Sequence, residues 1–470
     1  MVVPDALDEL RRALASGGLL TADDDLSRYE RPARGAVGRA RAVVRPAHTA
    51  EVQAVVRWAR RHHVHLVAQG ANTGLVGASV PDASGTMVVL SLERLRGDIV
   101  IDPVDRTAVV PAGTPLSVLN EALAHHGLMF PIDLGADPSI GGMVATNTGG
   151  ARMVRYGDVR HHVLGVEAVL ADDDASVLDA LSPLRKDNTG FRLADLFVGS
   201  DGALGVITRV AIEVVPRPRR RSTWWVVPRD DDAVAELLVH LEQWRAGALS
   251  AFELVSRPAF LAGLGHGEHG HDPFAGDDPP IVLLVEFSGG DEIDDDLVAA
   301  LAAAGALMSD GRTVPIDIAW GLRHAISEGL RSTGTVMGFD VSTTRSQIMA
   351  LRAAVAAVVA RYPPARLCDF GHAGDGGLHL NIVHPADAAP GPDGERALRD
   401  AVYAAVATFH GSFSAEHGIG PANAAWWRRY TSPIEQRLTA HVKHLFDPEG
   451  ILGRPDLPFT SIDIESEAAT

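Results

Sequence analysis

Residues 69–81 read QGANTGLVGASVP, and this stretch does most to decide the fold. Its glycines at 70, 74 and 77 alternate with small polar residues, directly after an apolar run at 64–68 that has the pattern of a strand. Glycine allows successive backbone N–H groups to turn inward and form a concave site for an anion. The spacing is not GxGxxG, so the dinucleotide fingerprint of a Rossmann fold is absent. Taken alone, the loop is equally compatible with an ordinary tight turn.

Two further stretches in the same half of the chain combine glycine with small polar residues. Residues 140–157 read IGGMVATNTGGARMVRYG, and residues 184–210 contain LRKDNTG and LFVGSDGALGVITRV. No Lys or Arg occurs from residue 69 to 93, so backbone amides and hydroxyls would have to bind any diphosphate there. Several small-residue loops in one domain predict an extended ligand that the backbone approaches closely.

Strand and helix patterns alternate along the chain, and their character changes near Pro216. Before it, an apolar strand at 42–46, a helix over 48–61 and a strand at 64–68 predict a βαβ unit. The proline-broken, basic segment PRPRRR at 216–221 is typical of a domain boundary. The patterns that follow predict an α+β domain with a mainly antiparallel sheet and helices on one face.

The composition is typical of a soluble globular protein with two or three domains. The chain has 470 residues and a net charge of −18, which disfavours nucleic acid and anionic membranes as partners. The N-terminus has the spacing of an amphipathic helix rather than the pattern of a signal peptide, and no apolar run reaches the roughly 20 residues of a membrane span. Cys368 is the single cysteine, which excludes an internal disulfide. We therefore expect a cytoplasmic protein.

A second group of motifs lies in the C-terminal half, where residues 371–382 read GHAGDGGLHLNI and residues 414–420 read SAEHGIG. A turn at GDGG would let His372 and His379 converge. Two imidazoles and a carboxylate form a ligand set suited to Zn²⁺, with Mn²⁺ or Fe²⁺ as alternatives. The spacing does not show that Glu416 takes part, and histidines in such a pattern are often structural.

Together these motifs resemble a known superfamily of flavoproteins. The glycine stretches are similar to the PCMH-type flavin-binding domain of the vanillyl-alcohol-oxidase superfamily. GHAGDGGLHLNI, SAEHGIG and DPEGILGRP at 447–455 resemble the C-terminal domain of its FAD-linked 2-hydroxy-acid dehydrogenases, nearest to the D-2-hydroxyglutarate and D-lactate dehydrogenases. The resemblance runs in the right order from about residue 40 to 454. It implies an α+β fold, with a PCMH-type FAD-binding domain followed by an FAD-linked oxidase C-terminal substrate domain of antiparallel sheet and helices.

Four parts of the chain are expected from the resemblance and the boundary signals. These are an N-terminal helical segment at 1–40, the FAD-binding domain at 41–216, the substrate and metal domain at 217–425, and a C-terminal segment at 426–470. The last segment is expected to be helical, to return to the FAD-binding domain and to end in a flexible acidic tail.

The resemblance implies FAD as a cofactor, with its diphosphate on Gly70 to Gly74. Covalent attachment through His or Cys is not expected, because the loop at 69–81 has neither residue. The predicted cofactor-binding residues are Gly70, Ala71, Asn72, Thr73, Gly74, Leu75, Ser79, Gly141, Gly142, Thr146, Asn147, Gly150, Gly205 and Ile207.

The resemblance also implies the reaction and its residues. It implies oxidation of a D-2-hydroxy acid to the 2-oxo acid by hydride transfer to flavin N5, with a divalent metal binding the substrate hydroxyl and carboxylate. The implied metal ligands are His372, His379 and Glu416, and the implied base is His417. The implied substrate-binding residues are Arg323, Ser327 and Asn381.

Departures from the family pattern bear on the substrate. Gly338 stands where 2-hydroxyglutarate dehydrogenases carry a lysine, and Asn423 stands where the family usually has another. The sequence therefore favours a D-2-hydroxy acid in general over 2-hydroxyglutarate. A metal-free flavin oxidase that reduces O₂ and a non-catalytic flavoprotein subunit stay open as alternatives. The electron acceptor, for which an electron-transfer flavoprotein and a quinone are candidates, and the oligomeric state, for which a homodimer is one, are not set by the sequence.

Overall fold

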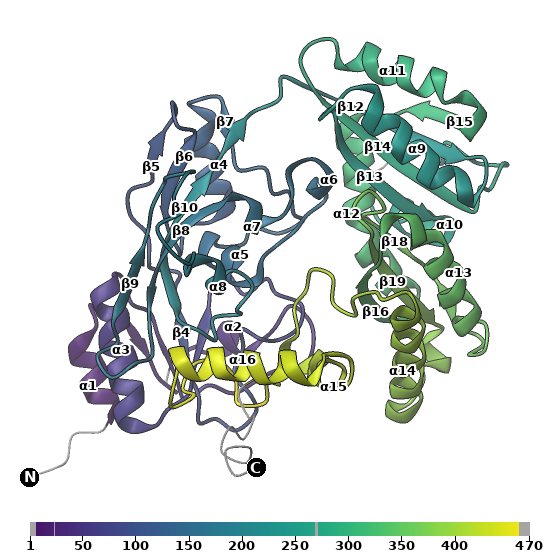
Figure 1. The fold of residues 1–470 in the computed structure, drawn as a ribbon. Coiled ribbons are helices and arrows are strands. Elements are labelled where there is room, and N and C mark those ends of the chain that lie inside the picture. The colour runs from purple at the N-terminus through teal and green to yellow at the C-terminus, as the bar shows by residue number, and fades with distance from the viewer. Residues whose placement is uncertain (1–5, 23, 268–270, 460–470) are drawn as a thin grey trace, which may run out of the picture. The chain divides into compact units, whose positions relative to one another are not determined.

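The computed structural model describes residues 6–22, 24–267 and 271–459, and Figure 1 shows its ribbon. The acidic tail expected at 460–470 lies outside the described residues. The chain divides into two compact units: the first contains Met1–Thr148, Asp158–Arg217 and His417–Thr470, and the second contains Gly149–Gly157 and Pro218–Glu416. No helix within the described ranges is long and apolar enough to cross a membrane.

In the part of the first unit that is described, the strands form three sheets. The strands are β1 (Leu19–Leu20), β2 (Ala42–Val44), β3 (Leu66–Gln69), β4 (Val88–Ser91), β5 (Val100–Asp102), β6 (Thr107–Pro111), β7 (Leu128–Met129), β8 (Val163–Val169), β9 (Val177–Ala180), β10 (Val206–Glu213) and β11 (Val215–Pro216). One sheet has the order β1-β2-β4-β3, the second is antiparallel with the order β5-β6-β10-β8-β9, and β7 pairs with β11.

The helices of the first unit pack against these sheets. They are α1 (Ala6–Ala13), α2 (Ser27–Glu30), α3 (Thr49–His62), α4 (Leu116–Ala124), α5 (Ile140–Thr146), α7 (Val159–His162), α8 (Ala194–Phe197), α15 (Gly420–Tyr430) and α16 (Pro433–Phe446). Helix α3 buries Val52, Val55 and Val56, whose spacing had predicted it. The predicted βαβ unit is present, but β4 lies between β2 and β3 and is parallel to both. The two strands of the predicted unit are therefore not hydrogen-bonded to each other, and β4, which follows β3 in the chain, pairs with both.

The C-terminal segment is tied into the first unit by a buried lysine. Nζ of Lys443 donates to the carbonyl oxygens of Ala203 and Leu452 over 2.8 and 2.9 Å and pairs with the carboxylate of Asp447. Leu452 also forms a parallel bridge with Leu66 of β3. The segment therefore supports the strand that leads into the 69–81 loop.

The second unit is built on one eight-stranded antiparallel sheet. Its strands are β12 (Arg220–Pro228), β13 (Leu249–Ser256), β14 (Ile281–Gly289), β15 (Met308–Thr313), β16 (Thr335–Ser342), β17 (Arg366–Leu367), β18 (Phe370–Gly371) and β19 (Gly377–His384). The order is β15-β12-β14-β13-β18-β19-β16, and β17 pairs with β19. This confirms the antiparallel α+β arrangement expected from the sequence.

Helices cover both faces of the central strands, rather than the single face that the sequence indicated. The helices are α6 (Met153–Tyr156), α9 (Asp231–Trp244), α10 (Arg257–Leu264), α11 (Ile293–Ala303), α12 (Ile316–Thr333), α13 (Ile348–Val359) and α14 (Pro392–Thr408), with short 3₁₀ turns at η1 (Gly305–Leu307), η2 (Arg345–Gln347) and η3 (Ala386–Ala388). Every residue of β13 is buried, so neither of its faces is solvated. Strands that are buried on both faces lack the alternation of apolar and polar residues, so the sequence could not show how many faces of the sheet are covered.

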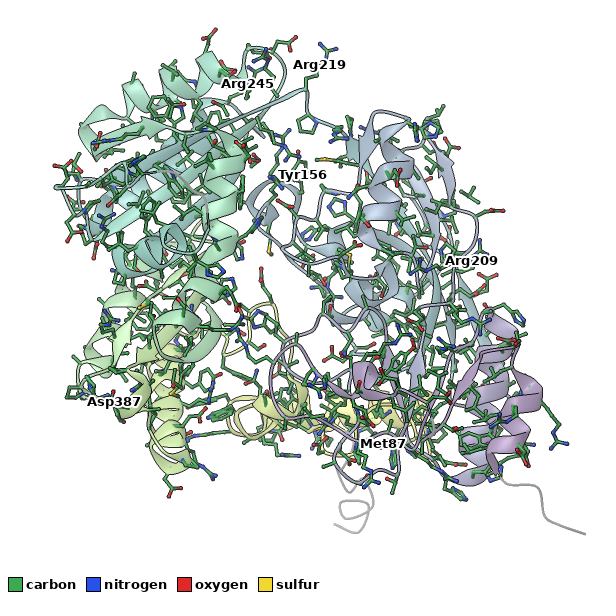
Figure 2. The ribbon with its side chains drawn as sticks, turned by 180° about the vertical axis from the view of Figure 1, so that it is seen from behind. Met87, Tyr156, Arg209, Arg219, Arg245 and Asp387 are labelled. Atoms are coloured by element: carbon green, nitrogen blue, oxygen red, sulfur yellow. The ribbon has the colours of Figure 1, made fainter. Side chains whose placement is uncertain are left out.

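Ion pairs in the second unit lie both at its surface and in its interior. Arg245, labelled in Figure 2, pairs with Glu292 over 2.5 Å and with Asp296 at the surface. Exposed pairs of this kind contribute little to stability, because water and salt screen the charges. By contrast, Nε of Arg152 donates over 2.9 Å to Oε1 of Glu286, which is fully buried. Loss of one partner of such a buried pair costs several kcal/mol, about 3–5 in measured cases.

The segment Gly149–Gly157 belongs to the second unit although it interrupts the first in sequence. Arg152 holds it to Glu286 of β14, and Arg155 donates to the side-chain oxygen of Ser288 over 2.6 Å. Both arginines border or lie in α6, the short helix that also contains Tyr156 (Figure 2). This placement could not be predicted from the sequence, because the partners lie more than 130 residues away.

Candidate functional site

The three predicted metal ligands converge in the second unit. Nε2 of His372 lies 3.3 Å from Nε2 of His379 and 3.4 Å from Oε1 of Glu416. All three ligand atoms lie within 4.8 Å of one another. Tetrahedral ligands held about 2.1 Å from a zinc ion lie about 3.4 Å apart. The donor set and its spacing therefore fit a divalent metal ion.

A tight turn after β18 brings the two imidazoles together. The backbone N–H groups of Asp375, Gly376 and Gly377 each donate to the carbonyl oxygen of His372 over 3.1 Å. Gly376 has a φ of +100°, a conformation that an L-residue with a side chain rarely adopts. The turn predicted at GDGG is thus the local cause of the cluster.

A glutamate that the sequence analysis missed binds the other ring nitrogen of His372. Oε1 of Glu253, on β13, lies 2.6 Å from Nδ1 of His372, and Oε2 accepts a hydrogen bond from Nε of Arg323 over 2.6 Å. Burial alone would raise the pKa of Glu253, but the charges of His372 and Arg323 outweigh it and lower the pKa to about 2. The available signal was a single charged residue in the strand-like run LSAFELVS.

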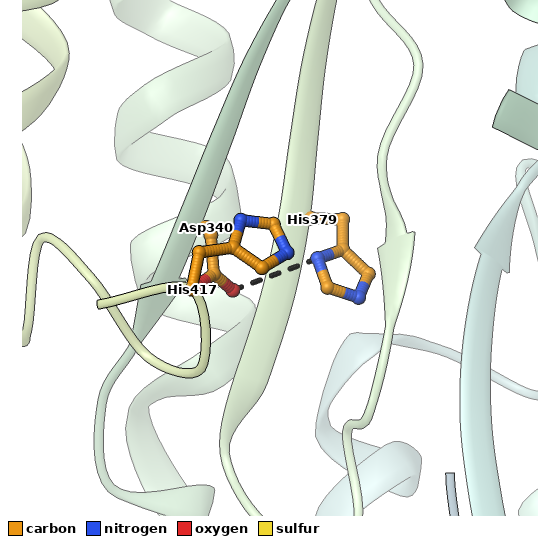
Figure 3. A group of neighbouring side chains, drawn as sticks. All are labelled: Asp340, His379 and His417. Carbon is orange, nitrogen blue, oxygen red and sulfur yellow. Dashed lines mark ion pairs between the residues drawn. The ribbon is translucent and has the colours of Figure 1, made fainter. Parts of the chain in front are cut away.

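His379 has an acidic partner on the neighbouring strand. Asp340 of β16 lies directly opposite His379 of β19, and its Oδ1 is 3.6 Å from Nδ1 of His379, as the dashed line in Figure 3 shows. Burial and the charge of His372 lower the pKa of His379 to about 4. The imidazole of His379 is therefore neutral near pH 7, the form that can bind a metal.

The carboxylates beside His372 favour the protonated form of its ring. Burial lowers its pKa, but the carboxylates of Glu253 and Glu416 outweigh burial and raise the pKa well above its usual value. A metal ion that binds at Nε2 competes with a proton for this atom, so metal binding and proton release are coupled.

The predicted substrate residues lie in the second unit, in different surroundings. Arg323 of α12 is 8% exposed, and its guanidinium stacks over the ring of Phe370 at 4.5 Å. Ser327, one turn further along α12, is exposed. Asn381 is buried on β19, two residues after His379 and therefore on the same face of the strand. Glu253 links Arg323 to His372 of the proposed ligand group, whereas no such contact is seen for Ser327 among the described residues.

The position of the predicted base follows from the chain itself. His417 comes directly after Glu416 and begins the last segment of the first unit.

The predicted flavin residues of the first unit gather around α5. Gly70 lies so close to Ser139, the N-cap of α5, that a Cβ on Gly70 would be 2.2 Å from Oγ of Ser139. The third glycine stretch reaches the same helix, because the N–H of Asp201 donates to the carbonyl oxygen of Ala145 over 2.8 Å. Three stretches that are far apart in sequence therefore meet at one helix.

The 69–81 loop offers an open cradle next to this helix. A Cβ added to Gly74 would meet no atom within 4 Å, and Ala71 is exposed. Asn72 adopts a left-handed conformation with a φ of +56°, and its Oδ1 accepts a hydrogen bond from Oγ of Ser79. Nη1 of Arg454 donates to the carbonyl oxygens of Val80 and Pro81 at the end of the loop, each over 3.2 Å. The free space beside the backbone of Gly74 fits a cofactor diphosphate bound by amides.

Other predicted flavin residues have structural partners. The side-chain amide of Asn147 donates to Asp158 over 2.8 Å, and its oxygen accepts from the N–H of Arg160. Oγ1 of Thr146 donates to the carbonyl oxygen of Gly142, and Ile207 lies in the core of the five-stranded sheet. Gly141 packs closely against Ala112, and Gly205 packs closely against Phe197. Thr73 and Leu75 are partly buried in the 69–81 loop. Gly150 belongs to the second unit.

Two family models together match most of the chain. Residues 40–178 match the family model of an FAD binding domain, and residues 217–455 match that of the FAD linked oxidases, C-terminal domain. The chain is 35% identical over 460 residues to a D-2-hydroxyglutarate dehydrogenase of Xanthomonas citri pv. viticola, covering 94% of each chain. It is 35% identical to a mitochondrial D-2-hydroxyglutarate dehydrogenase of Arabidopsis thaliana, covering 88% of this chain and 74% of the relative.

Solved structures share the fold at lower identity. A p-cresol methylhydroxylase solved with substrate bound has a TM-score of 0.70 at 17% identity, covering 98% of this chain and 97% of the other. The chain therefore belongs to the FAD-linked oxidases, with a PCMH-type FAD-binding domain and the C-terminal domain of that family. Within it, the protein is an FAD-dependent oxidoreductase similar to the D-2-hydroxyglutarate dehydrogenases.

Proposed function

We propose that the protein oxidises a D-2-hydroxy acid to the 2-oxo acid, with non-covalent FAD and a divalent metal, Zn²⁺ in the first place. The observation that carries the proposal is the convergence of His372, His379 and Glu416 at the spacing of a tetrahedral metal site. The names of the relatives support a 2-hydroxy acid as substrate. Electron transfer to an electron-transfer flavoprotein or a quinone, and a cytoplasmic location, belong to the same proposal.

The two cofactors would supply different parts of the chemistry: FAD accepts a hydride, and the metal acts as a Lewis acid toward the substrate hydroxyl. His372, His379 and Glu416 would hold the metal and leave a coordination position for substrate oxygen. His417 would take the hydroxyl proton, since imidazole is the commonest general base. Its attachment to Glu416 means that the ligand and the base are positioned by the same stretch of backbone.

Arg323 is the proposed partner of the substrate carboxylate. Its Nε–H is already bound to Glu253, so the planar guanidinium is held in one orientation, and its two Nη groups are the donors that remain for a carboxylate. Ser327 and Asn381 complete the proposed substrate-binding set. Gly338 lies directly opposite Asn381 in the β16–β19 ladder and contributes no charge to that face. We therefore favour a substrate without a second carboxylate at this position.

The decisive experiment is anaerobic bleaching of the flavin by a panel of D- and L-2-hydroxy acids, before and after treatment with EDTA. We expect D-acids to bleach the flavin, EDTA to abolish bleaching while the flavin spectrum stays, and added Zn²⁺ or Mn²⁺ to restore it. Metal-free protein that turns over in air with stoichiometric peroxide would instead support the flavin-oxidase alternative. Protein that binds FAD but is bleached by no 2-hydroxy acid under any metal condition would support the non-catalytic alternative.

Variants of two histidines test the base. His417→Ala should keep bound flavin and lose substrate-driven bleaching. The control is His441→Ala, which removes an exposed imidazole from α16. A His417→Ala protein that bleaches at the wild-type rate would refute the assignment.

A further inference from the structure

We infer that Glu253 is a positioning residue that joins the metal ligand His372 and the substrate-binding Arg323 into one rigid assembly. The inference rests on the proposed function and goes beyond it, because Glu253 belongs to neither ligand set. Each of its carboxylate oxygens has a different partner, with Oε1 at 2.6 Å from His372 and Oε2 at 2.6 Å from Arg323.

The fold fixes Glu253 in this place. It is fully buried on β13, a strand without an exposed residue. The next strand, β18, pairs with β13 through Leu254 and Gly371, the residues that adjoin Glu253 and His372 in the chain. The backbone ladder thus sets the distance between the carboxylate and the imidazole, and little side-chain freedom remains.

The carboxylate also determines which nitrogen of His372 is available to a metal. An ionised carboxylate only accepts hydrogen bonds, so Nδ1 of His372 must carry a proton. In the neutral ring the lone pair then resides on Nε2, the atom that faces His379 and Glu416. Carboxylate partners of this kind fix the tautomer and the orientation of metal-binding histidines, and their loss typically lowers metal affinity about 10–100-fold.

A glutamine cannot replace Glu253 in both contacts, because an amide has one oxygen and one NH₂ group. If the oxygen accepts from Arg323, the NH₂ group points at Nδ1 of His372 and favours the tautomer with the proton on Nε2. If the oxygen accepts from His372, the NH₂ group meets the N–H of Arg323, and two donors face each other. Glu253→Gln therefore breaks one contact or the other without changing the side-chain volume.

A second buried glutamate provides a matched control. Glu286, on the adjacent strand β14, is also fully buried and also binds an arginine, Arg152. It accepts a hydrogen bond over 2.8 Å from Nε1 of Trp320, which lies on the same helix as Arg323. Its described partners include none of the proposed metal ligands. Glu286→Gln thus removes an equivalent buried charge from the same helix–sheet interface.

The experiment measures zinc affinity of the metal-stripped, FAD-bound protein by competition with a chromophoric chelator. We expect Glu253→Gln to weaken zinc binding about 10–100-fold and Glu286→Gln to bind zinc as the wild type does. Glu253→Asp is the second variant: it keeps the charge but is one methylene shorter, so it cannot reach both partners and should also bind zinc weakly. Weak zinc binding by Glu253→Asp, which keeps the negative charge, would show that the position of the carboxylate matters and not its charge alone.

Several outcomes would overturn the inference. Wild-type affinity in both Glu253 variants would do so, and so would an equal loss of affinity in Glu286→Gln. His372→Ala distinguishes this failure from failure of the proposed function. If it abolishes zinc binding while the Glu253 variants do not, only the role of Glu253 is lost. If the wild type itself binds no zinc, the proposed metal site is lost together with it.

Discussion

The backbone N–H of Glu416 donates a hydrogen bond to Oδ2 of Asp340 over 2.7 Å, while Oδ1 of the same carboxylate lies 3.6 Å from Nδ1 of His379. One aspartate on β16 thus contacts two proposed metal ligands that come from separate segments. With Glu253 on His372, each imidazole of the cluster has an acid at Nδ1 and the shared centre at Nε2. Histidines that bind a metal through one ring nitrogen usually have a carboxylate or a carbonyl oxygen at the other.

Asp340→Asn should therefore lower zinc affinity about 10–100-fold, because the amide holds His379 and the backbone of Glu416 less firmly. The measurement is chelator competition on the FAD-bound protein. Asp387→Asn serves as control, since Asp387 is exposed in the η3 turn (Figure 2). Equal zinc affinity in both variants would show that Asp340 does not organise the site.

Gly74→Val tests the flavin cradle. The new side chain begins in space that no protein atom occupies within 4 Å, so folding should be preserved while a cofactor lying against the loop is displaced. We expect FAD affinity to fall about 10-fold or more, equivalent to about 1.4 kcal/mol, as measured by titration of the deflavinated protein. Gly305→Val, at a similarly open glycine of the second unit, should leave FAD affinity as it is. A Gly74→Val protein with wild-type flavin binding would place the diphosphate elsewhere.

The buried pair Arg152–Glu286 should make stability depend on pH. Burial alone would raise the pKa of Glu286. The charge and hydrogen bonds of Arg152, the hydrogen bond from Ser250 and the charge of Arg221 together outweigh burial, and the pKa lies below its usual value of 4.5. The carboxylate therefore stabilises the fold fully above pH 4.5 and loses this effect as the pH falls further.

Glu286→Gln should accordingly lower the free energy of unfolding by about 3 kcal/mol or more at pH 7, and the difference from wild type should shrink below pH 4.5. Denaturant unfolding followed by tryptophan fluorescence measures both. Glu292→Gln, in the exposed pair with Arg245, should have little effect at either pH. A difference that grows on acidification would contradict the sign derived for Glu286.

Gly338→Lys tests the proposed substrate preference. Strand alternation places the new ammonium on the face of β16 that Asp340 shares with His379 and Asn381. A charge-assisted hydrogen bond contributes about 1.5–3 kcal/mol, so kcat/KM for D-2-hydroxyglutarate relative to D-lactate should rise about 10-fold or more. Gly338→Met, of similar length without charge, should not raise this ratio. If both variants change the ratio alike, side-chain volume rather than charge is responsible.

Much of the site could be read from the sequence because its motifs are local. The turn after Gly371 lies within seven residues of chain, so GHAGDGGLH is sufficient to bring His372 and His379 together. The glycine loop at 69–81 was recognisable for the same reason. The participation of Glu416 had to be taken from the family resemblance, since more than thirty residues separate it from His379.

The acids behind the imidazoles could not be found in this way. Glu253 and His372 are 119 residues apart, and only the pairing of β13 with β18 brings them together. Asp340 was visible in the motif MGFDVSTTR, but its role depends on the register that sets it opposite His379.

By itself, then, the sequence determined the family, the glycine loops that we predict to bind flavin, and the approach of the two histidines, because short glycine-rich segments fix backbone shape within a few residues. Tertiary structure alone decided which acids orient those histidines, how Arg323 is joined to them, and that the segment Gly149–Gly157 packs with the second unit. The physical reason is that strand register and buried ion pairs join residues far apart in the chain, and their partners are chosen by packing rather than by spacing.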